Sequence, residues 1–259
     1  MKLDFFKYQG AGNDFVIIDN RSEDFPKKDY DLVAHLCDRK FGVGADGLML
    51  LEMASQADFK MDYFNADGKP GSMCGNGGRC IVAFAKSLGL FEKSTTFTAL
   101  GKSYRATLEN GLVSLHMLDV DDIEVYENHA FLDTGSPHHV TFVDNLEACD
   151  VYSVGRQIRY GKPYGDGGTN VNFVEKINDD TFSVRTYERG VENETLSCGT
   201  GVTAVALASF HLGKTSQKKI NINTPGGKLL ISFEHDEKGY RDIVLKGPAK
   251  FVFKGTIEI

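Results

Sequence analysis

Two segments of the chain are apolar on nearly every side of a helix, one over residues 81–88 and the other over residues 202–212. A helix without a polar face belongs inside a core, so we expect both to be buried. Each segment stops at a glycine, Gly89 and Gly213, and glycine is favoured where a helix ends in the left-handed conformation. The pattern predicts two equivalent buried helices of about three turns each.

Most of the remaining hydrophobic positions form short runs that alternate with polar residues or are rich in β-branched residues. Gly, Asn, Asp or Pro bound these runs, which is typical of strands. A sheet curled around a central helix, present twice, fits both patterns. The predicted strands cover residues 15–19, 48–52, 59–64, 103–108, 112–117, 140–143, 172–176, 182–187, 219–223, 228–234, 243–246 and 250–253.

The residues that precede the two apolar segments repeat one motif, because residues 72–77 (SMCGNG) are echoed by residues 196–201 (LSCGTG). An offset of 122 to 125 residues also aligns residues 13–20 with 138–145 and residues 64–68 with 187–190. A match of this width indicates two homologous domains rather than one shared motif.

We therefore predict an α+β fold of two pseudo-symmetric domains, each a curled, mostly antiparallel, barrel-like sheet around a central helix. The N-terminal domain is expected to comprise residues 1–118 plus 249–259 and to hold Cys74. The C-terminal domain is expected to comprise residues 119–248 and to hold Cys198.

Composition narrows the possible partners. The 259 residues carry a formal net charge of -7, and without a Lys/Arg-rich run they lack the basic patch of a nucleic-acid surface. No stretch approaches the roughly 18 apolar residues of a membrane helix, and the N-terminus has no secretory h-region. We therefore expect a cytoplasmic protein with a small-molecule partner, no nucleic acid and no membrane.

The five cysteines form no C-x-x-C pair and leave one unpaired in any disulfide scheme, which favours reduced thiols. No zinc-site spacing is present, so no metal is expected. Residues 42–47 (GVGADG) satisfy G-x-G-x-x-G, but a predicted strand follows them instead of the helix that a dinucleotide site requires. Neither a P-loop nor a lysine in a pyridoxal phosphate context is present, so no cofactor is expected.

Cys74 and Cys198 each stand at the start of a glycine-rich helix. Such a start leaves backbone N–H groups open to an anion, and its partial positive charge favours a thiolate over a thiol. If two such starts face each other across a domain cleft, they can hold an amino acid carboxylate with its α-carbon between the sulfurs. That arrangement would invert a stereocentre. The alternative is that both cysteines are structural, as we expect for Cys37, Cys80 and Cys149, which lack this context.

Four motifs together resemble the diaminopimelate epimerase family: residues 10–15 (GAGNDF), 64–68 (FNADG), 73–80 (MCGNGGRC), and 187–190 (YERG) followed by 197–201 (SCGTG). The resemblance implies a homodimer and a cofactor-independent two-base epimerase. Its reaction would interconvert LL- and meso-2,6-diaminopimelate, a precursor of lysine and peptidoglycan.

The resemblance also implies roles for particular residues. Cys74 and Cys198 would be the catalytic acid and base, and His138 and Glu188 would assist them. The implied substrate-binding residues are Asn13, Asn65, Gly75, Asn76, Ser136, Asn170, Glu188, Arg189, Gly199 and Thr200. From the residues alone, structural interpretations also stay open. Asn13 and Asn65 could be ordinary turn residues, and His138 could be a loop histidine.

The chain departs from the family pattern at three places. Ser136 stands where the family commonly has Asn, Gly47 stands where some members have Gln, and residues 191–197 form a stretch one residue longer than usual. A shorter hydroxyl replaces an amide at the first of these positions.

Three other functions are compatible with parts of the pattern. A racemase or epimerase for proline or hydroxyproline would share the cysteine pair, but not the second amino acid end that Asn65, Asn170 and Arg189 would bind. A cysteine hydrolase or acyltransferase needs one activated cysteine with a histidine base, which leaves the second motif unexplained. A non-catalytic binding protein has no use for the repeated cysteines.

Overall fold

The computed structural model describes residues 2–71 and 73–259, so Ser72, the first residue of the first repeated motif, lies outside the described residues. The chain divides into two units. Unit 1 comprises the residues up to Leu115 together with Gly247–Ile259, and unit 2 comprises His116–Lys246. The sequence-based divisions were 118/119 and 248/249.

Unit 1 is a sheet in which strands β17, β1, β2, β3, β4, β5, β6 and β7 follow one another as neighbours. Two neighbouring pairs, β2–β3 and β4–β5, are parallel and the others are antiparallel. Helix α2 contacts β1, β2, β3, β6 and β17, so the sheet curls around it. The elements are β1 (Lys2–Gly10), β2 (Asn13–Asp19), α1 (Tyr30–Cys37), β3 (Gly47–Glu52), β4 (Phe59–Asn65), α2 (Gly75–Ser87), β5 (Ser94–Ala99), β6 (Lys102–Glu109), β7 (Leu112–His116) and β17 (Lys250–Glu258).

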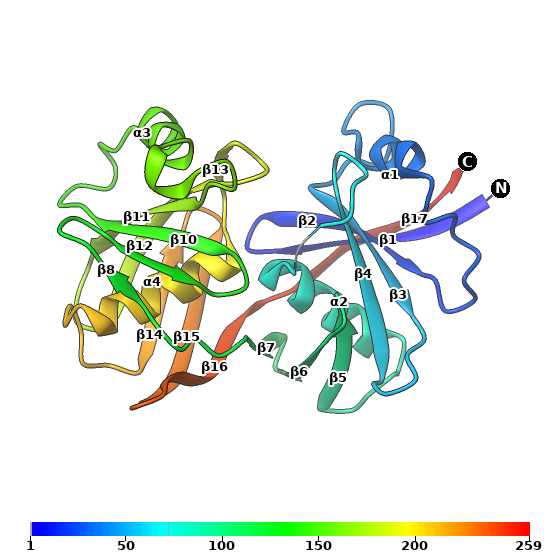
Figure 1. Ribbon diagram of the computed structural model, residues 1–259. Helices are drawn as coiled ribbons and strands as arrows, with labels where there is room; N and C mark the ends of the chain where they lie inside the picture. The colour runs from blue at the N-terminus through cyan, green and yellow to red at the C-terminus, as the bar shows by residue number, and fades with distance from the viewer. Residues whose placement is uncertain (1, 72) are drawn as a thin grey trace. The chain divides into compact units, whose positions relative to one another are not determined.

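Unit 2 repeats this plan. Strands β8, β9, β10, β11, β12, β14, β15 and β16 are successive neighbours, β13 pairs with β12, and the parallel pairs are β10–β11 and β12–β14. Helix α4, yellow in Figure 1, contacts β9, β10, β11, β12, β14 and β15. The elements are β8 (Glu124–Val125), β9 (Ala130–Asp133), β10 (Pro137–Phe142), α3 (Val151–Arg159), a 3-10 helix (Lys162–Tyr164), β11 (Asn170–Lys176), β12 (Thr181–Glu188), β13 (Asn193–Thr195), α4 (Gly199–His211), β14 (Lys219–Thr224), β15 (Gly227–Asp236) and β16 (Gly239–Pro248).

The two units therefore share an order of elements. In each, one helix crosses over between the first pair of parallel strands, α1 in unit 1 and α3 in unit 2. The buried helix, α2 or α4, crosses over between the second pair. Because a parallel pair needs a crossover connection, the helices occupy equivalent places, and the predicted two-domain α+β fold is confirmed.

The helix ends agree with the glycine pattern. Helix α2 ends before Gly89, which has φ 74°, and α4 ends before Gly213, which has φ 64°. The strand prediction missed β1, β5, β9 and the short β8 and β13, and helices α1 and α3 were not predicted. Helix α3 has only nine residues, and two of its hydrophobic side chains, Tyr152 and Val154, are exposed. In the part of the chain that the structure describes, no helix is long and apolar enough to cross a membrane.

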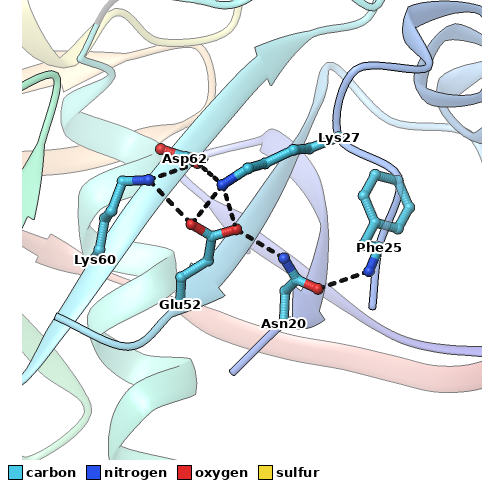
Figure 2. A network of polar contacts seen from close by, with 6 residues as sticks. All are labelled: Asn20, Phe25, Lys27, Glu52, Lys60 and Asp62. Atoms are coloured by element: carbon cyan, nitrogen blue, oxygen red, sulfur yellow. Dashed lines mark hydrogen bonds and ion pairs between the residues drawn. The ribbon is translucent and has the colours of Figure 1, made fainter. Parts of the chain in front are cut away.

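A buried carboxylate ties the connection after β2 to the sheet of unit 1 (Figure 2). The Glu52 side chain, only 4% exposed, accepts hydrogen bonds from Lys27, Lys60 and Asn20 at 2.7 to 3.0 Å. Asn20 in turn accepts a hydrogen bond from the backbone N–H of Phe25 at 2.9 Å. This network holds the connection that leads into α1 against β3 and β4.

Candidate active site

Cys74 is the N-cap residue of α2, with extended backbone angles of φ -106° and ψ 118°. The backbone N–H of Gly77 donates to its sulfur over 3.4 Å. The sulfur therefore takes the place that a serine or aspartate oxygen takes at most helix starts. Gly75 and Asn76, the first two residues of the helix, are both buried.

Asn13 lies beside this cysteine. Its Nδ2 donates to Asp46 Oδ2 over 2.7 Å, which turns its Oδ1 toward the helix start. Asn13 Oδ1 accepts from Asn76 Nδ2 at 3.4 Å and from the Cys74 thiol at 3.5 Å. An amide oxygen can only accept a hydrogen bond, so this neighbour favours Cys74 in its protonated form.

A fully buried arginine fixes Asn76. Arg79 Nη2 donates to Asn76 Oδ1 over 2.9 Å, and its Nη1 donates to the Gly75 carbonyl over 3.1 Å. Burial lowers the pKa of Arg79 below its ordinary value. Asn65 is exposed at the end of β4, where its backbone carbonyl accepts from Gly68 N–H in a turn. The turn interpretation thus describes the backbone of Asn65, whereas Asn13 lies in contact with Cys74.

Cys198 is the N-cap residue of α4, and it is 6% exposed. Its sulfur lies 3.4 Å from Thr200 Oγ1, and the same hydroxyl lies 2.9 Å from Nε2 of His138. His138 is on β10 and has no exposed surface. Burial, together with the positive charge of Arg189, lowers its pKa to about 3. The imidazole is therefore neutral at neutral pH.

Ser136, Asn170 and Arg189 form a second polar group in unit 2. Asn170 Nδ2 and Arg189 Nη2 both donate to Ser136 Oγ, at 2.9 and 3.4 Å. Asn170 Oδ1 accepts from the backbone N–H of Arg189 at 2.9 Å. The shorter Ser136 side chain thus still joins the residues that were expected to bind the distal end of a substrate.

Glu188 lies at the end of β12, directly before Arg189 in the sequence. Its Oε2 accepts from Thr195 Oγ1 at 2.9 Å, across the β12–β13 hairpin. The longer stretch after Glu188, residues 191–197, includes part of the hairpin tip, where Glu192 adopts φ 58°, and strand β13. Glu192 also accepts from Arg159 at 3.1 Å.

The structure explains the glycine at position 47. A Cβ atom there would lie 2.6 Å from the Phe64 carbonyl oxygen and 2.6 Å from the ring of Tyr63. No side chain fits while Tyr63 occupies this space, so a glutamine at this position would need a different neighbour.

The cysteines outside the repeated motifs have other surroundings. Cys37 and Cys80 are buried, and burial raises the pKa of each thiol to about 12. Both are thus protonated at neutral pH. Cys149 is half-buried on the connection before α3.

Three further residues belong to these two groups of side chains and were not anticipated: Asp46, Arg79 and Asn172. Asn172 donates to His138 and is completely buried. The sequence could have indicated Asn172, because residues 170–174 form a buried strand. Asn170 and Asn172 are the polar positions on one face of this strand. A buried polar side chain calls for a specific partner.

Comparison with known proteins agrees with this fold. The family model described as diaminopimelate epimerase matches the chain twice, over residues 5–130 and 130–252. A solved structure of a phenazine biosynthesis protein of the PhzF family from Bacillus anthracis has a TM-score of 0.80 at 15% identity, with both chains fully covered. A hydroxyproline epimerase from Agrobacterium vitis has a TM-score of 0.69 at 13% identity, covering 99% of this chain and 92% of that one.

The closer sequence relatives carry one name. A diaminopimelate epimerase from Flavobacterium psychrophilum is 54% identical over 258 residues, covering 99% of this chain and 100% of the relative. Another from Chlorobaculum tepidum is 45% identical, with 96% and 99% covered. The chain is thus an isomerase of the epimerase and racemase class. It belongs to the diaminopimelate epimerase family.

Proposed function

We propose that this protein interconverts LL- and meso-2,6-diaminopimelate without a cofactor, using Cys74 and Cys198 as acid and base. The observation that carries the proposal is the repeated cysteine at the N-cap of the buried helix in each unit. The name shared by relatives up to 54% identical supports the substrate.

The chemistry requires one cysteine to begin as a thiolate and the other as a thiol. The thiolate removes the α-proton, and the thiol returns a proton to the opposite face of the same carbon, which inverts it. In the reverse direction the roles exchange. Because an α-proton beside a carboxylate is weakly acidic, the N–H groups at the helix starts must stabilise the charge that develops on that carboxylate. Gly75, Asn76, Gly199 and Thr200 would supply them.

The distal amino acid end of the substrate distinguishes this reaction from that of a proline racemase. Arg189 offers a planar guanidinium suited to a carboxylate. Ser136 Oγ accepts from this guanidinium, and Asn170 Oδ1 accepts from the backbone N–H of Arg189. Asn13 and Asn65 would complete the substrate-binding set. His138 and Glu188 would assist the two cysteines.

The test is incubation of the purified, reduced protein with LL-diaminopimelate in D2O without added metal or cofactor. We expect meso-diaminopimelate carrying one α-deuterium. If a folded, reduced sample shows no isomerisation and no deuterium exchange, the proposal is overturned. If only hydroxyproline undergoes exchange, the proposed substrate is wrong.

Single substitutions separate the cysteine roles. Cys74→Ser and Cys198→Ser should each lower kcat by several orders of magnitude, because a serine hydroxyl is a far weaker acid than a thiol. Cys149→Ser is the matched control and should keep full turnover. If only one of the two N-cap cysteines mattered, a cysteine nucleophile would replace the two-base mechanism.

We also propose a cytoplasmic homodimer, as the family resemblance implies. Light scattering on the protein as eluted from a sizing column tests the assembly. A mass of twice 28.5 kDa is expected, and a monomer at micromolar concentration would contradict it.

A further inference from the structure

Asn172 lies at the centre of β11 in unit 2, between β10 and β12, and has no exposed surface. All its polar atoms have partners. Its Nδ2 donates to the backbone carbonyl of His139 at 2.9 Å and lies 3.1 Å from His138 Nδ1. Its Oδ1 accepts from Thr186 Oγ1 at 3.0 Å.

These contacts fix the proton on the neighbouring imidazole. The His139 carbonyl can only accept, so the amide nitrogen of Asn172 must face it. That nitrogen cannot accept, so His138 Nδ1 must be the unprotonated ring atom. Since burial keeps His138 neutral, its single ring proton is on Nε2.

The proton on Nε2 determines how the next group is used. His138 Nε2–H donates to Thr200 Oγ1 over 2.9 Å. A hydroxyl that accepts this bond keeps its own proton for another acceptor, and the Cys198 sulfur lies 3.4 Å away. The hydroxyl can then donate to a thiolate.

We infer that Asn172 is a positioning residue for the proposed epimerase reaction: by holding His138 as the Nε2–H tautomer, it directs the Thr200 hydroxyl proton to the sulfur of Cys198. This inference rests on the proposed function for its catalytic meaning. The Thr200 hydroxyl thereby offers a donor to the sulfur of Cys198, whereas the sulfur of Cys74 contacts a donor, the Gly77 N–H, and an acceptor, Asn13 Oδ1.

Unit 1 shows that the fold itself does not require this polar relay. His138 pairs with Asn170 in the parallel β10–β11 ladder, and Phe15 pairs with Gly47 in the parallel β2–β3 ladder. Asn172 lies two residues after Asn170 on β11, and Met49 lies two residues after Gly47 on β3. Phe15 and Met49 are both completely buried.

The helix contacts support the same equivalence. A Cβ atom on Gly201 would lie 2.6 Å from Asn172 Oδ1, and a Cβ atom on Gly77 would lie 3.1 Å from Met49 Sδ. In this structural alignment of the two units, His138 is equivalent to Phe15. The alignment differs by two residues from the sequence alignment of residues 13–20 with 138–145. Apolar side chains therefore fill in unit 1 the places that His138 and Asn172 occupy in unit 2.

The first test is the tautomer itself, which does not depend on any substrate. In protein labelled with 15N-histidine, we expect His138 to show a pyridine-like shift at Nδ1 and a pyrrole-like shift at Nε2 at neutral pH. In Asn172→Asp, a carboxylate accepts from the ring, so Nδ1 should become protonated. A protonated Nδ1 in the unsubstituted protein would overturn the inference.

The second test is a double-mutant cycle with Thr200→Val, which removes the hydroxyl and keeps the shape. Each single variant should lower kcat about tenfold to a hundredfold with a much smaller change in KM, as expected for a lost hydrogen bond to a charged group. The double variant should be no slower than Thr200→Val alone. Multiplicative losses would show that Asn172 acts through packing and would overturn the inference.

Asn223→Asp is the matched control, since Asn223 is a half-buried strand residue of unit 2 that donates to Ser183. It should leave turnover and the His138 shifts unchanged.

If Asn172→Asp does not fold, Thr200→Val still decides the inference: it should slow alkylation of Cys198 by iodoacetamide without changing the His138 tautomer. Unchanged alkylation would contradict it. If diaminopimelate is not turned over at all, the proposed function fails, while the tautomer and alkylation results stand separately.

Discussion

The amide oxygen of Asn13 lies 3.5 Å from the sulfur of Cys74, in an orientation that Asp46 imposes through its 2.7 Å hydrogen bond to the amide nitrogen. In Asn13→Asp, a carboxylate replaces this amide and disfavours a thiolate beside it. We expect alkylation of Cys74 by iodoacetamide at pH 8 to slow about tenfold. Peptide mass mapping measures the rate, and Cys198 is the internal control. An unchanged Cys74 rate would show that Asn13 has no influence on the sulfur.

Gly201 and Gly77 hold equivalent places in α4 and α2, but they face different side chains. A methyl group at Gly201 meets the fixed amide of Asn172 at 2.6 Å, whereas one at Gly77 meets the flexible end of Met49 at 3.1 Å. We expect Gly201→Ala to lower kcat at least tenfold more than Gly77→Ala does. Steady-state kinetics of the two variants, with thermal melts to verify folding, make the comparison. Equal losses would argue against a special role for the Asn172 contact.

Gly47 should be intolerant of any side chain, because a Cβ atom would lie 2.6 Å from the Phe64 carbonyl. Gly47→Ala is expected to lower the free energy of unfolding by about 1 to 3 kcal/mol through overpacking. Gly167→Ala serves as the control, since nothing lies within 4 Å of a Cβ atom there. Urea unfolding measures both variants. A stability unchanged by Gly47→Ala would mean that the Tyr63 side of the strand yields easily.

Glu52 should make the free energy of unfolding depend on pH. Burial raises the pKa of this carboxyl, but hydrogen bonds from Lys27, Lys60 and Asn20 outweigh burial and lower it from 4.5 to about 2. A carboxyl whose pKa is lower in the folded state stabilises the fold above its unfolded pKa. That contribution is lost as the pH falls from about 4.5 toward 2.

The pKa difference corresponds to at most about 3 kcal/mol, and solvent screening of the partly exposed lysines reduces the expected contribution to about 1 to 2 kcal/mol. Glu52→Gln should lose this amount at pH 7, and its deficit should shrink as the pH falls below 5. Denaturant unfolding between pH 7 and 3 checks this, with the exposed Glu109→Gln as control. A deficit that does not change with pH would indicate lost packing instead of lost charge.

Features that are local or repeated along the chain could be predicted from the amino-acid sequence. An apolar pattern without a polar face predicted both buried helices, and Gly89 and Gly213 marked their ends. The repeated motif identified Cys74 and Cys198 as residues at the helix starts, because the conformation of a helix start depends on a few consecutive residues. The two-domain fold followed from the duplication, since each half repeats one order of hydrophobic segments.

Contacts between residues that are distant in the sequence could not be predicted and depend on the three-dimensional fold. The pairing of β1 with β17 joins Lys2 to Glu258, and no local pattern could show that contact. The same holds for Asn172, His138 and Thr200, which come from two strands and a helix. Their contacts depend on strand register, in which a shift of one residue turns a side chain to the other face. The sequence alignment of the two halves was two residues out of register on this strand, and so it gave His138 the wrong counterpart.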